Sequence, residues 1–103
     1  MMHANDSRED ILTRRARRHA RKGDYRKAAL ALRERVALRG DAASWVALGD
    51  MLRRARRVPE AVKALKQGMY LHRQRGAEGR VRTVARMLVA LDPWHSRVTD
   101  MVA

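Results

Sequence analysis

The chain has 103 residues, the length of one domain, and its 24 Lys and Arg against 11 Asp and Glu leave a net charge of +13. It contains no cysteine, which excludes disulfides and thiolate metal sites. It also contains no Phe. The apolar residues are mainly Ala, Leu, Val and Met, and because helix-favouring residues dominate while strand-favouring ones are sparse, we expect an all-α fold.

The first two predicted helices begin at capping residues and end at glycines. Ser7 and Asp10 have the spacing of a capping box, with Asp in place of the usual Glu. The first helix is therefore expected to start there and to run to Lys22. Asp24 follows a glycine and is the predicted N-cap of a second helix over 25–39.

Residues that favour the start of a helix recur along the rest of the chain. Asp41 repeats the capping device, Pro59 suits the first turn of a helix, and Asp92 with Pro93 opens a final short segment. The remaining helices are then predicted over 42–56, 59–76, 78–91 and 92–103. Residues 1–6 are expected to be disordered and residues 7–103 to form a single domain.

Apolar residues recur at helical spacing within these segments and predict the core. The stripes comprise Ala28, Ala29, Leu30, Leu32, Val36 and Leu38; Trp45, Leu48, Gly49 and Leu52; Ala61, Leu65, Gly68, Met69 and Leu71; and Val81, Val84, Ala85, Leu88 and Val89. The deepest burial is expected at Trp45, Leu48, Leu52, Leu65 and Leu88.

The chain also resembles itself. A shift of 33 residues pairs Leu12 with Trp45, Ala28 with Ala61, Ala31 with Ala64, Leu32 with Leu65, Val36 with Met69 and Leu38 with Leu71. A further shift of 36 residues pairs Trp45 with Val81, Gly49 with Ala85 and Leu52 with Leu88. Small residues meet small ones and large meet large, which indicates repeated helical hairpins.

The second hairpin resembles the tetratricopeptide repeat. The residues that carry the resemblance are Trp45, Leu48, Gly49, Leu52, Ala61, Leu65 and Gly68. It implies a short α-solenoid of antiparallel helical hairpins, about two and a half repeats and six helices, with turns near Gly23, Val58 and Asp92. Arg15, His19 and Arg35 depart from the pattern, because they occupy positions that are usually apolar or small.

We predict no catalytic, cofactor-binding or metal-binding site, and no enzymatic activity. The histidines His3, His19, His72 and His95 include no pair at i, i+4, and His72 and His95 are expected on the surface. Gly76 to Gly79 is interpreted as a helix break and not as a phosphate-binding loop. No signal peptide or membrane span is visible, so a soluble cytoplasmic protein is expected.

Clustered arginines are the surface feature that indicates a binding site. The candidate partner-binding residues are Arg14, Arg17, Arg18, Arg21, Arg53 and Arg54. By the resemblance they would lie near a concave groove, with Asp50 beside them. The family's carboxylate clamp is not expected, because its positions would be Thr13, Arg17 and Ala47, with no Asn. A purely structural interpretation stays open, since cations are also favoured at helix C-termini.

Three functional hypotheses follow. The leading one is an adaptor that binds an acidic peptide or protein surface, to which arginine makes bidentate contacts. The second is nucleic-acid binding, which the charge favours and the lack of exposed aromatic residues opposes. The third is self-assembly through an uncapped apolar edge on the fifth and sixth helices. Trp94 either packs the last helix onto the fifth or is partly exposed for a partner.

Overall fold

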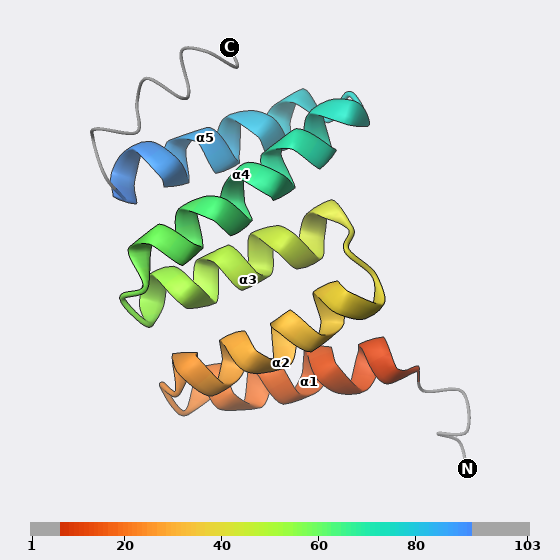
Figure 1. Ribbon diagram of the computed structural model, residues 1–103, viewed down its shortest axis with the longest axis vertical. Coiled ribbons are helices and arrows are strands. Elements are labelled where there is room, and N and C mark those ends of the chain that lie inside the picture. Colours follow the sequence, from red (N-terminus) through yellow and green to blue (C-terminus); the bar gives the residue numbers. More distant parts are fainter. Residues whose placement is uncertain (1–6, 92–103) are drawn as a thin grey trace.

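A computed structural model describes residues 7–91, and in this part of the chain it contains five α-helices and no strand (Figure 1). The helices are α1 (Arg8–Arg21), α2 (Tyr25–Leu38), α3 (Ala42–Arg54), α4 (Val58–Gln74) and α5 (Glu78–Leu91). The all-α prediction is confirmed for these residues. The helix ends fall within about two residues of the predicted positions, which is the usual uncertainty of a helix end.

Several predictions concern residues 1–6 and 92–103, which lie outside the described residues. They are the disordered N-terminus, the short sixth helix with its turn near Asp92, the role of Trp94 and the surface position of His95. They remain predictions.

Side-chain caps start α1, α2 and α3, as the capping pattern predicts. In each, the side-chain oxygen of the cap residue accepts a hydrogen bond from the backbone N–H three residues later. The pairs are Ser7 with Asp10, Asp24 with Lys27 and Asp41 with Ser44, at 3.1, 3.2 and 2.9 Å. α4 begins without a side-chain cap and has Pro59 in its first turn, where the missing N–H costs nothing.

Three connections between helices share one backbone geometry. Gly23, Arg56 and Gly76 have φ angles of 77°, 64° and 71°, in the left-handed region. In each case the next residue donates its backbone N–H to a carbonyl in the last turn of the preceding helix. This is the Schellman ending of a helix, which favours glycine at the left-handed position. Arg56 is therefore the exception among the three.

The helices form a row in which each packs mainly against the helices before and after it in the chain (Figure 1). The contact is most extensive within the pairs α1/α2 and α3/α4, and it is smaller between α2 and α3 and between α4 and α5. The turns at Gly23 and Arg56 join the helices of the α1/α2 and α3/α4 pairs. Hairpin turns near Gly23 and Val58 are thus where the repeat predicts them.

Two glycines allow α3 and α4 to approach closely. A Cβ atom on Gly49 of α3 would lie 2.6 Å from the side chain of Leu65. One on Gly68 of α4 would lie 2.6 Å from the side chain of Val46 and 3.3 Å from the carbonyl oxygen of Ala42. Neither position has room for a larger residue while the helices keep this separation. This is the role expected for the small residues of the second hairpin.

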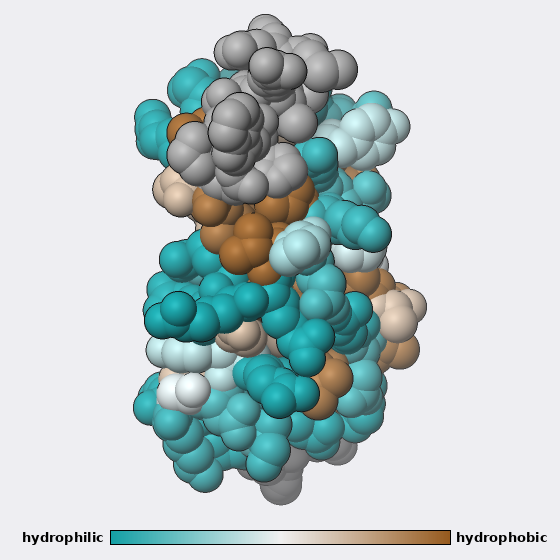
Figure 2. All heavy atoms as spheres, turned by 60° about the vertical axis from the view of Figure 1, so that its left-hand side comes forward, coloured by the Kyte–Doolittle hydropathy of each residue, from teal (hydrophilic) through white to brown (hydrophobic). Residues whose placement is uncertain are grey.

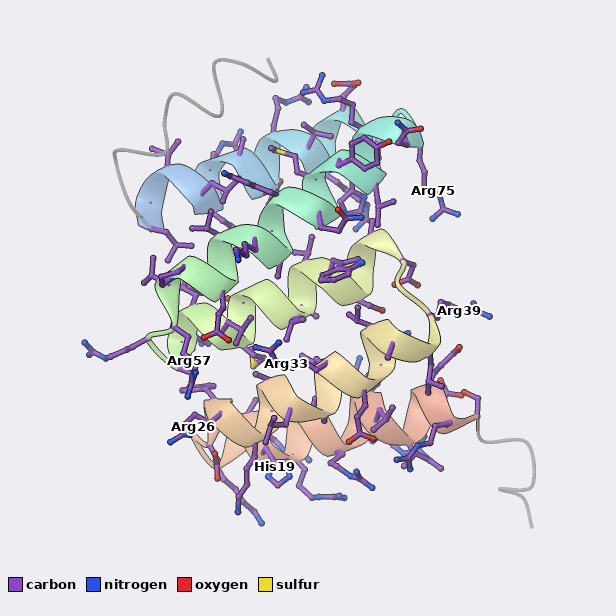
Figure 3. All side chains as sticks on the ribbon, viewed as in Figure 1. His19, Arg26, Arg33, Arg39, Arg57 and Arg75 are labelled. Atoms are coloured by element: carbon purple, nitrogen blue, oxygen red, sulfur yellow. The ribbon has the colours of Figure 1, made fainter. Side chains whose placement is uncertain are left out.

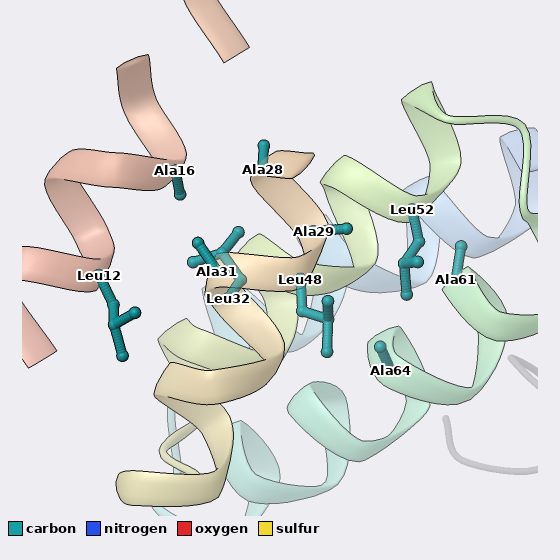
Figure 4. Packing of buried hydrophobic residues seen from close by; sticks show 10 residues of the cluster. All are labelled: Leu12, Ala16, Ala28, Ala29, Ala31, Leu32, Leu48, Leu52, Ala61 and Ala64. Atoms are coloured by element: carbon teal, nitrogen blue, oxygen red, sulfur yellow. The ribbon is translucent and has the colours of Figure 1, made fainter. Parts of the chain in front are cut away.

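The core consists of two clusters, and the larger one is built from alanine and leucine (Figure 4). Its larger cluster joins α1 to α4 and comprises Leu12, Ala16, Ala28, Ala29, Ala31, Leu32, Leu48, Leu52, Ala61 and Ala64. A second cluster joins α4 to α5 and comprises Val62, Leu65, Met69, Val81, Val84 and Leu88. The predicted burial of Leu48, Leu52, Leu65 and Leu88 is confirmed. Trp45 is only partly buried and packs against the edge of the larger cluster.

Three predicted stripe residues are exposed instead. Leu30 and Leu38 of α2 are 60% and 55% exposed, and Val89 of α5 is 39% exposed. The reason for Leu30 is its angular position. It lies two residues from both Ala28 and Leu32, which are buried, and two residues correspond to about 200° around a helix. Its side chain therefore points away from the core that α2 contacts.

Candidate interaction surfaces

The outer side of α1 is a surface of exposed arginines. Leu12 and Ala16 bury the inner side of the helix in the core. As the first described helix of the row, α1 packs closely on α2 alone. The predicted binding residues of this helix, Arg14, Arg17, Arg18 and Arg21, are all exposed. In the view of Figure 2, the lower part of the molecule, formed by α1 and α2, is mainly hydrophilic, and hydrophobic side chains gather higher up.

Arginines elsewhere are held by carboxylates on other helices. Arg8 of α1 binds Glu34 of α2 at 2.9 Å, Arg39 binds Glu9 at 3.2 Å, and Arg33 of α2 binds Glu60 of α4 at 2.6 Å. By contrast, Arg17, Arg18 and Arg21 form no ion pair with any residue that the structure describes. The described part of the chain therefore leaves these cations without a counter-charge.

The two predicted binding residues at the end of α3 are in a different situation. Arg53 and Arg54 share the carboxylate of Asp50, with nitrogen-to-oxygen distances of 2.5 and 3.4 Å. The guanidinium of Arg54 also lies over the ring of Tyr25, 5.8 Å from its centroid, which is a cation–π contact. Arg53 and Arg54 are thus partly neutralised within the chain, whereas Arg17, Arg18 and Arg21 of α1 have no ion pair with a described residue.

A shallow groove of about 210 Å³ lies between α1 and α3. Its lining residues are Thr13, Ala16, Arg17, Ala20, Leu32, Ala47, Asp50 and Met51. Of the candidate binding residues, Arg17 lines this groove and the others do not, and Asp50 faces it from α3. The three positions matched to the carboxylate clamp lie together in it, but Thr13 and Ala47 offer no amide for a carboxylate.

A second groove lies between α2 and α4 and has α3 as its floor. It consists of a hollow of about 500 Å³ and a smaller one of about 150 Å³, which share Arg33 and Leu52. The larger is lined by Arg33, Trp45, Leu48, Leu52, Glu60, Lys63, Ala64 and Gln67. The smaller is lined by Arg26, Ala29, Leu30, Arg33, Leu52, Ala55 and Arg57. We call this the α2–α4 groove.

Sequence reasoning did not anticipate the α2–α4 groove. The hydrophobic period correctly places Trp45 on the inward side of α3. It carries no information about the distance between α2 and α4, the two helices on either side of this residue. The indole Nε1 forms no hydrogen bond with a described residue. It lies close to Gly40, where a Cβ atom would be 3.1 Å from Nε1. No signal in the sequence separates a core tryptophan from one at the edge of a groove.

Arginines also determine the electrostatics of the carboxylates around α3. The hydrogen bond from Arg57 lowers the pKa of Glu60, against the effect of burial and with further help from Arg33. At the start of α3, burial opposes ionisation of Asp41, but hydrogen bonds from Ser44 and the charges of Arg35 and Arg39 outweigh it and lower the pKa. Both carboxylates therefore stay ionised at neutral pH.

Arg35 explains one departure from the repeat. The 33-residue shift places it where the second hairpin has Gly68. Its guanidinium reaches the beginning of α3, where Nη1 donates a hydrogen bond to the buried hydroxyl of Ser44 and lies 3.9 Å from Asp41 Oδ1. The arginine thus ties the end of α2 to the start of α3.

His72 is buried, and the prediction of a surface position is wrong. The residue lies in the last turn of α4 and is 8% exposed. Burial lowers the pKa of its imidazole, with the charges of Arg80 and Arg75 acting in the same direction.

The described residues contain no cluster of His, Asp or Glu that fits a metal ion. None of the described helices is both long and apolar enough to span a bilayer.

Comparisons with known proteins identify no relative: no family model, no curated protein and no solved structure matches this chain.

Proposed function

We propose that this chain is a small, non-catalytic adaptor of the tetratricopeptide-like α-solenoid type, which binds an acidic peptide or protein surface. The observation that carries the proposal is the arginine surface of α1. Arg17, Arg18 and Arg21 are exposed and unpaired within the described residues, while Arg8, Arg33 and Arg39 are held by carboxylates. Dense like charges repel one another, and an acidic ligand relieves that repulsion.

The repeat supports the solenoid part of the proposal. The small residues matched by the 33-residue shift have matching burial: Ala28 and Ala61 are both 0% exposed, and Ala31 and Ala64 are 2% and 3% exposed. The shift also pairs Gly23 with Arg56, which share the left-handed turn. Two hairpins that share their small buried positions and their turn geometry support a repeat array.

Within the proposed site the residues have unequal roles. Arg14, Arg17, Arg18 and Arg21 present charge along α1. Arg53 and Arg54 are bound to Asp50, so a partner carboxylate would have to compete with it. We therefore assign most of the binding energy to α1 and a smaller share to the end of α3.

A nucleic-acid partner is the second candidate, and one observation favours it. Exposed cations without an ion pair to a described residue also occur at the other end of the row, at Arg73, Arg75, Arg80, Arg82 and Arg86. Charge distributed over both ends suits a long polyanion. Against it, no exposed aromatic ring lies among the arginines of α1 on which bases would stack. Self-assembly through the C-terminal helices remains a prediction.

The test is an affinity capture from native cell extract, with and without nuclease, using two charge-matched double variants. Arg17→Glu with Arg21→Glu reverses two exposed charges on α1, and Arg82→Glu with Arg86→Glu makes the same change on α5. We expect the α1 variant alone to lose one defined, nuclease-resistant protein partner, with its Tm nearly unchanged. Capture of the same partner at full strength by the α1 variant refutes the proposed site. Loss of all binding after nuclease treatment favours nucleic acid.

A further inference from the structure

The α2–α4 groove combines an apolar floor with basic rims. Leu48 and Leu52 of α3 form the centre of the floor, and Trp45 lies at one end. The lining runs along α3 from Trp45 to Ala55, the residue that follows the helix. At the rise of an α-helix this is a length of about 15 Å, or about three turns.

Two side chains offer apolar surface to a partner in this groove. Leu30, on the α2 rim, is 60% exposed. Trp45 is partly exposed, and its indole N–H makes no hydrogen bond within the described residues. Tryptophan and arginine are the residue types most enriched where binding energy concentrates at interfaces.

The charge of the rims selects the chemistry of the partner. Arg26, Arg33, Arg57 and Lys63 line the groove, against the single carboxylate of Glu60. Glu60 is already bound by Arg33 at 2.6 Å and by Arg57 at 3.1 Å. Arg26 and Lys63 have no ion pair with a described residue. In Figure 3, Arg26, Arg33 and Arg57 lie on the same side of the molecule, around the end of the groove formed by α2 and the turn before α4.

We propose that the α2–α4 groove binds an acidic amphipathic helix of a protein partner. Its apolar side contacts Leu30 and Trp45, and its carboxylates face Arg26, Arg57 and Lys63. An amphipathic helix that lays its apolar face into a groove is a common mode of recognition. A second copy of this chain is a poor occupant, because each copy has a net charge of +13. The inference goes beyond the proposed function, since it assigns a second surface apart from α1.

The experiment uses the full chain and a synthetic helical peptide of about 15 residues, near the shortest length at which isolated helices form. The peptide contains Glu, Ala and Leu, with the leucines on one face. A second peptide has the same composition with the leucines scattered, and a third has Lys in place of Glu. The Trp94→Phe background leaves Trp45 as the sole tryptophan of the chain. We expect the first peptide alone to change the Trp45 fluorescence.

A matched pair of variants tests the site. Leu30→Glu and Leu38→Glu change exposed leucines of the same helix, 60% and 55% exposed, and of the two only Leu30 lines the groove. We expect Leu30→Glu to weaken peptide binding about tenfold or more, the loss of one important contact. Leu38→Glu should stay within about twofold of the parent. Lys63→Glu, paired with Arg86→Glu on α5, checks the charge contribution in the same way.

Several results overturn the inference. One is an equal effect of Leu30→Glu and Leu38→Glu, and another is equal binding of the scattered peptide, since both show attraction by charge alone. Unchanged Trp45 fluorescence on binding also overturns it. So does a peptide-free dimer that Leu30→Glu dissociates, because a second copy then occupies the groove. Arg17→Glu with Arg21→Glu should retain peptide binding. If it does not, the peptide binds α1, which supports the proposed function and refutes the groove.

Discussion

Arg56, in the turn from α3 to α4, has the same left-handed backbone conformation as Gly23 in the turn from α1 to α2, with φ angles of 64° and 77°. The hydrogen bonds of the two turns match as well, Asp24 to the His19 carbonyl and Arg57 to the Leu52 carbonyl, both at 2.9 Å. A residue with a Cβ atom is strained in this conformation, whereas glycine is not. The second hairpin therefore folds with a turn that its own sequence does not favour.

Arg56→Gly should raise stability, by up to about 1 kcal/mol, because it removes the strain of the left-handed position. The measurement is thermal unfolding followed by circular dichroism, in which a gain of that size appears as a rise of several degrees in Tm. Arg56→Ala is the control, since it removes the charge but keeps Cβ and should bring no such gain. An equal rise of Tm in both variants would show that the removal of the Arg56 charge, and not the relief of backbone strain, causes the gain.

Gly49→Ala should destabilise the fold by about 1 to 3 kcal/mol, the usual effect of overpacking. The new Cβ would lie 2.6 Å from Leu65, so α3 and α4 have to move apart. Gly79→Ala is the matched control, because the nearest atom is 3.9 Å away, the terminal nitrogen of Arg82. Alanine favours a helix more than glycine does, so this control should be neutral or stabilising. Equal losses in urea unfolding would contradict the close approach of α3 and α4.

Leu48→Ala and Leu65→Ala should each cost about 2 to 5 kcal/mol, the range for leucines truncated in a core. Their side chains are 3% and 0% exposed. Leu30→Ala, at an exposed position of α2, should change the unfolding free energy by less than about 0.5 kcal/mol. If both core variants melt within a few degrees of the parent protein, these positions are not the core.

Stability should decrease as the pH falls from neutral through the ordinary pKa of histidine. Burial, Arg80 and Arg75 lower the pKa of His72 in the fold. The unfolded chain then binds the proton first, at about pH 6.5. The free energy of unfolding therefore falls progressively as the pH drops from there to the lower pKa of the native state. His72→Leu keeps the site apolar and should show a smaller loss of Tm between pH 7.5 and 5.5. An unchanged slope in that variant would show that His72 does not cause the dependence.

At lower pH the carboxylates take over the pH dependence. The pKa of Asp41 lies below its ordinary value of 3.8 in the fold, so its contribution to stability is present above that value and is lost as the pH falls through the lower one. Asp41→Asn should reduce the loss of stability below pH 4. Asparagine also caps helices, so the start of α3 is retained and the comparison reports the charge.

The sequence by itself determined the helices and most of their ends. Ser7, Asp24 and Asp41 cap the helices they were predicted to cap, because capping depends on a side chain and a backbone N–H only three residues apart. Helical spacing also identified Gly49 and Gly68, the small residues at the α3/α4 contact, since the period of a helix records which residues share its buried side.

Only the tertiary structure decided which side chains are exposed at the edges of the core and which charges are paired. Leu30 and Trp45 lie on predicted apolar stripes, and yet both line the α2–α4 groove. The Arg33–Glu60 ion pair joins α2 and α4, which are not consecutive helices. Arg17, in contrast, has no ion pair with a described residue. Such pairings depend on distances between helices, and periodicity within one helix carries no information about those distances.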